Sequence, residues 1–353
     1  MVADRWPTSL PLPILTDVGG TGRESTQWYL DGVREFFRCF ADRGPNAGFL
    51  STRERPLVAL PLVGTGDGGM AGQAGEMVDV LFPVLVAEAE RHHCDVALVL
   101  RSEPAFHAAQ SARRHWQPDE IWNACLGAGN VAEAQRLSQL AVDGRLVLFL
   151  GAGVSAGAQL PDWNGLLLQL AASLDMPAEE FGTEGLTEVG SLDIARLIQM
   201  HLEKRRVAGQ TDRSLGEQIA ECLRSHTSYS LAHGLIASMP VTEMITTNYD
   251  RLMEAAAAGC GRPLTVLPYE PSETSRRWLL KLHGCLEHPQ DIVLTRSDYL
   301  RYDDRRAALR GIVQAMLMTR HMLFLGFSLT DDNFHRIADD VRKALSDRTD
   351  VSE

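Results

Sequence analysis

The chain has 353 residues, a length that favours two domains over one. Its 34 Lys and Arg residues against 46 Asp and Glu residues give a net charge of −12. This balance argues against direct, sequence-specific binding to nucleic acid, because phosphates require a basic surface. Apolar residues make up 45% of the sequence and charged residues 23%, a composition typical of a folded globular protein.

The sequence carries no signal for membrane insertion or for a metal site. No apolar run approaches the roughly 20 residues that span a bilayer, and residues 1–7 lack the apolar core of a signal peptide. The six cysteines include no CxxC pair, the usual source of structural zinc ligands. We therefore expect a cytoplasmic protein that does not bind a membrane and holds no zinc or other metal.

The first region, residues 1–140, alternates apolar runs with amphipathic patterns. Strand, helix, strand, helix and strand in this order predict a small α/β domain with parallel strands. The helical, linker-like residues 116–142 place the domain boundary near residue 140. The predicted strands are 12–15, 56–63 and 96–100, and the predicted helices are 26–41 and 74–92.

The second region, residues 141–353, opens with the continuous apolar run 145–150, which is typical of a buried parallel strand. A largely helical stretch from 177 to 239 then predicts an inserted subdomain. The predicted fold class is α/β: a Rossmann-like parallel sheet with this helical subdomain, preceded by the smaller α/β domain. Further predicted elements are a helix at 164–173 and strands at 244–247, 279–282, 292–294 and 322–325.

A glycine-rich turn, Gly151-Ala152-Gly153-Val154-Ser155, joins the first strand of the second region to a helix. Glycines at such a turn let the backbone approach a pyrophosphate, whose charge is stabilised by amide groups and a helix N-terminus. Many strand–helix turns are rich in glycine without binding anything. The turn by itself therefore leaves a nucleotide site and a purely structural turn as alternatives.

Polar residues follow three later strands of the same region. Asn248, in Thr246-Thr247-Asn248-Tyr249-Asp250, could hold a ribose hydroxyl or a water, and Asp250 could instead cap the next helix. His283, in the His-Gly pair after residues 279–282, is a candidate general base because a histidine side chain ordinarily titrates near neutral pH. The segment 326–328 could offer backbone amides to a nucleotide.

The order GAGxS, PDW, TTNYD, HG and GFS over about residues 143–340 resembles the sirtuin-like NAD-binding family. More closely, it resembles the bacterial sirtuin-like NAD hydrolases of antiphage defence. The resemblance implies NAD as substrate, with Asn248 orienting a water and His283 handling a ribose hydroxyl proton. It implies further NAD contacts at Gly151, Ala152, Gly153, Ser155, Asp162, Trp163, Thr247, Asp250, Gly326 and Ser328.

Two departures bear on the reaction. Sirtuin deacylases carry a four-cysteine zinc ribbon after the His-Gly motif, and here only Cys285 follows it; Asp162-Trp163-Asn164 also replaces an Asp-Phe-Arg segment. The resemblance then favours hydrolysis of NAD to nicotinamide and ADP-ribose, as an NAD-depleting effector of abortive infection. The alternatives are a protein deacylase or ADP-ribosyltransferase, or a non-catalytic NAD- or ADP-ribose-binding module of a larger defence complex.

The first region resembles the later half of a macro domain. Residues 60–69 match an ADP-ribose loop and residues 15–20 a preceding phosphate loop. The alternative is a regulatory or oligomerisation domain that binds no ligand. The family resemblance also implies a homo-oligomer and a separate partner, such as an ATPase or translocase, because toxic NAD hydrolysis must be controlled.

Overall fold

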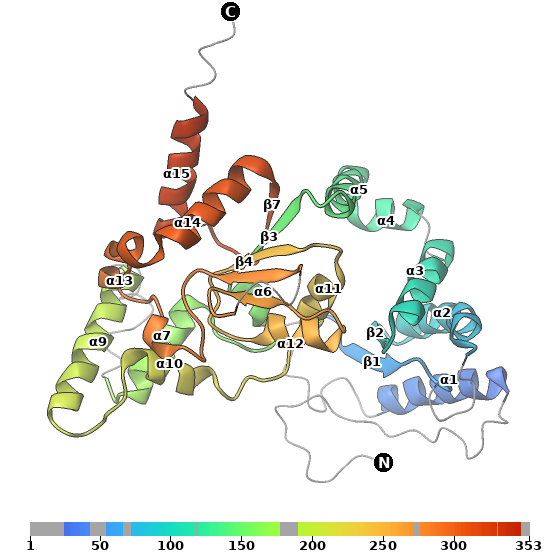
Figure 1. The fold of residues 1–353 in the computed structure, drawn as a ribbon. Helices are drawn as coiled ribbons and strands as arrows, with labels where there is room; N and C mark the ends of the chain where they lie inside the picture. The colour runs from blue at the N-terminus through green and yellow to red at the C-terminus, as the bar shows by residue number, and fades with distance from the viewer. Residues whose placement is uncertain are drawn as a thin grey trace, which may run out of the picture. The chain divides into compact units, whose positions relative to one another are not determined.

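The computed structural model describes residues 25–42, 54–65, 72–116, 119–176, 190–270, 276–329 and 331–346. The chain divides into two compact units, Met1–Glu133 and Ala134–Glu353, coloured from blue to green and from green to red in Figure 1. Among the described residues, no helix is both long and apolar enough to cross a membrane.

The first unit has two parallel strands covered by helices. Its apolar side chains recur at helical spacing along α1, so that Leu30, Val33 and Phe37 all face the core. The strands pair in parallel, with Leu57 opposite Asp95. The elements are α1 (Thr26–Asp42), β1 (Leu57–Pro61), α2 (Ala74–Arg91), β2 (Asp95–Val99), α3 (Glu103–Trp116) and α4 (Asp119–Leu126).

These elements confirm the strands predicted at 56–63 and 96–100 and the helices predicted at 26–41 and 74–92. The strand predicted at 12–15 and most of the macro-like loops, residues 15–20 and 66–69, lie outside the described residues. The resemblance of this unit to a macro domain therefore stays a prediction.

The second unit is built on a five-stranded parallel sheet in the order β5-β6-β4-β3-β7. Its middle strand β3 reads Leu-Val-Leu-Phe-Leu and buries all five side chains, as expected for a strand covered on both faces. This sheet and its helices confirm the predicted Rossmann-like α/β class. The strands are β3 (Leu146–Leu150), β4 (Glu243–Thr246), β5 (Thr265–Leu267), β6 (Trp278–Lys281) and β7 (His321–Leu325).

Helices pack against the sheet of this unit, and those that lie between β3 and β4 in the sequence include α7, α9 and α10, which form a separate cluster (Figure 1). Ile198 of α9 and Ile219 of α10 lie within the predicted helical stretch 177–239, and they share a core with Leu170 of α7, which precedes that stretch. The helices are α5 (Ala128–Val142), α6 (Gly153–Ala156), α7 (Trp163–Ser173), α9 (Ser191–Val207), α10 (Leu215–Leu223), α11 (Leu231–Ser238), α12 (Leu252–Gly259), η2 (Pro289–Asp291), α13 (Arg296–Leu300), α14 (Tyr302–Thr319) and α15 (Asp332–Ser346).

One strand prediction is wrong, and one strand of the sheet was not predicted. Residues 292–294 form a loop, because Val293 is held by one backbone bond to His283 and by the Tyr249 hydroxyl, and not by a ladder. Strand β5 was not predicted: it has three residues, pairs on one side only and is followed by Pro268. Short edge strands leave too little periodicity to detect.

Because all five strands are parallel, their carboxyl ends lie at one edge of the sheet. The loops after β3, β4, β6 and β7 begin at that edge, and each contains one of the polar or glycine-rich motifs. The crevice beyond such an edge is where open α/β sheets bind ligands.

Candidate functional site

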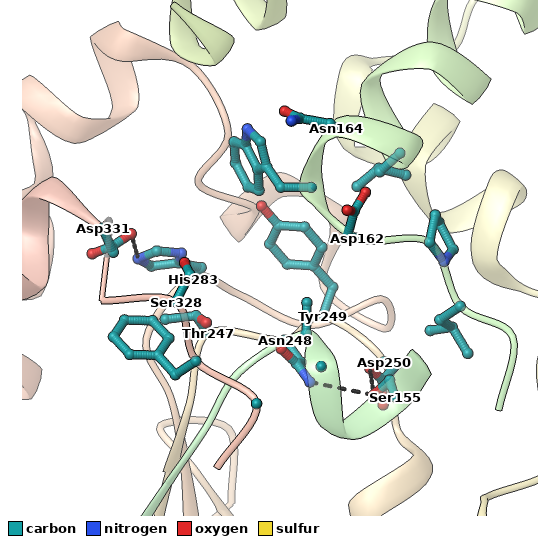
Figure 2. Close-up of a pocket in the computed structure, with 18 of the residues that line it drawn as sticks. Ser155, Asp162, Asn164, Thr247, Asn248, Tyr249, Asp250, His283, Ser328 and Asp331 are labelled. Atoms are coloured by element: carbon teal, nitrogen blue, oxygen red, sulfur yellow. Dashed lines mark hydrogen bonds and ion pairs between the residues drawn. The ribbon is translucent and has the colours of Figure 1, made fainter. Parts of the chain in front are cut away.

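A cavity of about 780 Å³ lies beyond the carboxyl ends of the strands, within the size range of small-molecule and cofactor sites. The predicted site residue Gly151 does not line the cavity. The other predicted site residues all line it: Ala152, Gly153, Ser155, Asp162, Trp163, Thr247, Asn248, Asp250, His283, Gly326 and Ser328. The fold thus brings together residues that are up to 176 positions apart, and several of them are visible in Figure 2.

The glycine loop after β3 packs directly against the loop after β7. The Gly153 amide donates to the Gly326 carbonyl at 2.9 Å, and the Gly151 amide donates to the Leu325 carbonyl at 3.0 Å. A Cβ on Gly153 would lie 2.8 Å from the Gly326 Cα, and Gly326 itself has a positive φ of 61°. The close approach of the two backbones therefore requires these glycines. They have this structural role whether or not a nucleotide binds.

The Asn248 side chain is oriented by acceptors beside the cavity. Its Nδ2 donates to the Gly151 carbonyl at 3.0 Å and to Ser155 Oγ at 3.3 Å. A carbonyl can only accept, so the amide nitrogen must face Gly151 and the amide oxygen must face away from it. Figure 2 shows the nitrogen directed at Ser155. The amide oxygen is left as an acceptor for a ligand or a water.

Both carboxylate oxygens of Asp250 accept hydrogen bonds from other groups of the protein. Its Oδ2 accepts from Ser155 Oγ at 2.9 Å, and its Oδ1 accepts from the Leu252 amide at 3.0 Å in the first turn of α12. Asp250 thus satisfies the amide of the first residue of α12, whose N-cap residue is Arg251. The carboxylate still lines the cavity and lends it negative charge.

Asp162 is the N-cap residue at which α7 begins, because its carboxylate accepts from the Gly165 amide at 2.7 Å. The neighbouring Trp163 is the first residue of that helix. Both residues line the cavity from the side of the helical cluster. The loop between β3 and α7 is therefore anchored at both ends, at Gly153 and at Asp162.

His283 follows β6 and is only 3% exposed. Its Nε2 lies 3.5 Å from Asp331 Oδ2, and its ring meets the edge of Tyr299. Burial lowers the pKa of His283; the Asp331 carboxylate opposes this shift, and the Arg306 guanidinium reinforces it. The imidazole is therefore neutral at neutral pH, the form that can accept a proton.

Asp331 was not predicted from the sequence. Its Oδ2 also accepts from the Tyr299 hydroxyl at 2.7 Å, and its Oδ1 accepts from the Phe334 amide at 2.8 Å. One carboxylate thus joins His283, Tyr299 and the start of α15. An aspartate three residues after a Gly-Phe-Ser turn gives no signal of this role, because its partners are 32 and 48 positions away.

Lys281 was not predicted either. It is fully buried, its ammonium lies 2.9 Å from Glu254 Oε1, and it donates to the Asp250 carbonyl. Burial lowers the pKa of Lys281, but the Glu254 carboxylate, with Cys285 and Asp250, more than offsets it and raises the pKa. This charged lysine holds the backbone of the loop that carries Asn248 and Asp250.

Acidic residues outnumber basic ones around the cavity. Asp162, Asp250, Asp331 and Asp332 line it, and the lining cation Arg296 is held by Asp193 at 2.8 and 3.0 Å. Within the described ranges, no group of three or more His, Cys, Asp or Glu side chains is arranged to bind a metal ion.

The family comparison agrees with the motifs at the strand ends. Residues 242–351 match the family described as the SIR2-like domain. The resemblance to sirtuin-like proteins predicted from the sequence is confirmed. The match begins at β4 and therefore includes Asn248, His283 and Asp331. The glycine loop lies outside the matched residues and follows β3, the strand that pairs with β4.

Three curated relatives extend the comparison. The chain is 30% identical over 217 residues to the NAD(+) hydrolase ThsA of Enterococcus faecium, covering 60% of this chain and 43% of that protein. It is 27% identical over 225 residues to defense-associated sirtuin 2 of Bacillus subtilis, with 62% and 21% covered. It is 28% identical over 202 residues to ThsA of Bacillus cereus (strain MSX-D12), with 56% and 40% covered. The aligned regions therefore span less than half of each of these relatives.

Proposed function

We propose that this protein hydrolyses NAD at its N-glycosidic bond and releases nicotinamide and ADP-ribose. The observation that carries the proposal is that Asn248 and His283, at the ends of the neighbouring strands β4 and β6, line one cavity with the glycine loop. Relatives named NAD(+) hydrolases support the same activity.

In the proposed complex, the pyrophosphate and its adjoining ribose lie against the glycine loop. The nicotinamide end lies toward the start of α7, and the nicotinamide ribose lies near the loop after β4. The adenosine half contacts the loop after β7. In this complex the pyrophosphate and its ribose contact Gly151, Ala152, Gly153 and Ser155, and the nicotinamide end contacts Asp162 and Trp163. The nicotinamide ribose contacts Thr247, Asn248 and Asp250, and the adenosine half contacts Gly326 and Ser328.

The reaction breaks the bond between the ribose C1′ and the nicotinamide nitrogen. The electron pair of that bond leaves with nicotinamide, which becomes neutral, while positive charge develops on the ribose ring. The carboxylates of the cavity stabilise this charge by electrostatics. The Asn248 amide oxygen orients a water toward C1′, and neutral His283 accepts the proton that a ribose hydroxyl or this water gives up.

The test is nicotinamide release from NAD by the full chain, compared with Asn248→Ala and His283→Ala. Each substitution removes a group at the reacting centre, so we expect a loss of at least about a hundredfold. Asn130→Ala, on an exposed face of α5, and His107→Ala, on an exposed face of α3, are the matched controls because neither residue lines the cavity. Release that is unchanged in Asn248→Ala, or a product other than free ADP-ribose, would contradict hydrolysis.

We place this activity in the cytoplasm, as the NAD-depleting step of an antiphage response that ends in abortive infection. The relative named defense-associated sirtuin 2 supports this role. We further propose a homo-oligomer controlled by the first unit or by a separate ATPase or translocase. NAD levels after phage infection, in cells with the wild type and with Asn248→Ala, test the role. An unchanged NAD level in wild-type cells would contradict it.

A further inference from the structure

A second histidine, His233, lies behind the cavity and has no part in the reaction as described above. It is on α11, is 1% exposed and does not line the cavity. Its ring nevertheless belongs to a hydrogen-bond network that reaches Asn248 through Ser155. A fully buried imidazole in such a network has a fixed protonation state and a fixed orientation.

The Nδ1 side of His233 faces donors. The Ser230 amide lies 3.3 Å from it and the Ser230 hydroxyl 2.9 Å, in the capping box that begins α11. A backbone N–H can only donate, so Nδ1 must accept and carries no proton. In a neutral imidazole the proton is then on Nε2. Burial lowers the pKa of His233, although the Asp250 carboxylate opposes the shift, so the neutral form is the stable one.

The Nε2 side of His233 faces Ser155 Oγ at 3.3 Å. The single proton of that hydroxyl goes to Asp250 Oδ2, because an ionised carboxylate only accepts. The Asn248 Nδ2 only donates, so it occupies one of the two lone pairs of Ser155 Oγ. The remaining lone pair accepts from His233. The arguments from both sides of the ring give the same tautomer.

We propose that His233 is a positioning residue whose Nε2–H, through Ser155, holds the Asn248 amide in the orientation that the Gly151 carbonyl also favours. With three partners, Ser155 has no freedom to rotate its hydroxyl, and Asn248 must present its oxygen to the cavity. The proposal rests on the proposed function, in which that oxygen orients the attacking water. Loss of the Nε2–H leaves Ser155 held on that side by Asp250 alone, which weakens the second of the two acceptors that orient the Asn248 amide beside the Gly151 carbonyl.

Two substitutions separate positioning from helix capping. His233→Asn keeps an acceptor for the Ser230 amide but is too short to reach Ser155. His233→Gln is long enough to donate to Ser155 with its amide nitrogen. Ile236→Ala, in the apolar core on the same helix, is the control for lost stability alone.

For nicotinamide release, we expect kcat to fall about tenfold in His233→Asn, which is the effect of one lost hydrogen bond at a reacting group. We expect kcat to recover to within about threefold of the wild type in His233→Gln, while KM changes less than kcat in both. Ile236→Ala lowers Tm without this loss of kcat. Wild-type kcat in His233→Asn, or an equal loss in both histidine variants, overturns the proposal.

A second measurement does not depend on activity. In ¹⁵N NMR spectra of the full chain at neutral pH, we expect the His233 signal, assigned by its absence in His233→Gln, to show the neutral Nε2–H tautomer. The Asn248 side-chain amide, assigned by its absence in Asn248→Ala, exchanges slowly in the wild type and in His233→Gln and rapidly in His233→Asn. An Nδ1–H tautomer, a charged ring or unchanged exchange in His233→Asn overturns the positioning role. A wild type that releases no nicotinamide contradicts the proposed function alone.

Discussion

At the scale of single residues, the pairing of His283 with Asp331 decides how the cavity can handle a proton. The histidine is buried between a carboxylate that raises its pKa and the Arg306 guanidinium that lowers it. Burial is the largest influence, and the net shift is downward. The neutral imidazole therefore persists below pH 6.5, the ordinary pKa of histidine, at about which an exposed one takes up its proton.

Asp331→Asn tests this arrangement through the pH profile. Removing the carboxylate removes the influence that raises the pKa of His283, so we expect the acidic limb of kcat to move to lower pH. We also expect kcat at neutral pH to fall about fivefold, because the ring loses an oriented partner. The measurement is nicotinamide release between pH 5 and pH 8.

Asp339→Asn is the control for this prediction. Asp339 is on α15, is paired with Lys343 and Arg342, and does not line the cavity. Its profile should match that of the wild type. An acidic limb that moves to higher pH in Asp331→Asn would show that Asp331 does not act on His283 as described.

At the scale of elements, the two glycine loops at the ends of β3 and β7 behave as one packed unit. Gly326→Ala would force a side chain against the Val154 amide and the Gly153 backbone at a positive φ. We expect it to lower the free energy of unfolding by about 1–3 kcal/mol and to reduce NAD affinity, because the loop shape changes. Urea unfolding and calorimetric titration with NAD measure the two effects.

Gly311→Ala, in the middle of α14, is the matched substitution. A Cβ at that position meets nothing within 4 Å, and alanine favours helix over glycine by about 0.5–1 kcal/mol. We therefore expect it to stabilise the protein slightly. If Gly326→Ala unfolds at the same urea concentration as the wild type, the packing argument is wrong.

The buried ion pair between Lys281 and Glu254 joins β6 to α12, and Lys281 also donates to the Asp250 carbonyl in the loop that carries Asn248. Lys281→Met leaves the Glu254 carboxylate buried without its partner, and breaking such a pair costs about 3–5 kcal/mol. We expect the double variant Lys281→Met/Glu254→Gln to recover most of that loss. Urea unfolding of the two variants measures it, and equal midpoints would contradict the pairing.

At the scale of the whole molecule, each compact unit has a core of its own. Phe37, Met77 and Leu81 anchor the first, and Leu148, Phe149 and Leu170 belong to the second. Residues 134–353 include every residue that lines the cavity. We expect this segment to fold alone, with a single cooperative unfolding transition, and to bind NAD as the full chain does.

Thermal unfolding and calorimetric titration of residues 134–353 against the full chain test this expectation. Higher nicotinamide release from the segment than from the full chain would support control by the first unit. A segment that fails to fold, or that folds and does not bind NAD, would show that the first unit completes the catalytic one.

The sequence by itself determined the parallel α/β class and the order of the motifs, and its resemblance to the sirtuin-like family implied eleven residues that line the cavity. The class and the place of the motifs follow from local patterns: a continuous apolar run such as 145–150 indicates a buried strand, and parallel strands bring their carboxyl ends together. A polar or glycine-rich motif after each such run is thereby assigned to one edge of the sheet.

Only the tertiary structure decided what holds those residues in place. His233 reaches Ser155 across 78 positions, Asp331 reaches His283 across 48, and Gly153 meets Gly326 across the sheet. Each contact joins segments whose own patterns give no sign of the other. A buried polar group must find its partner wherever the packed chain provides one, so such partners are specified by the fold and not by local spacing.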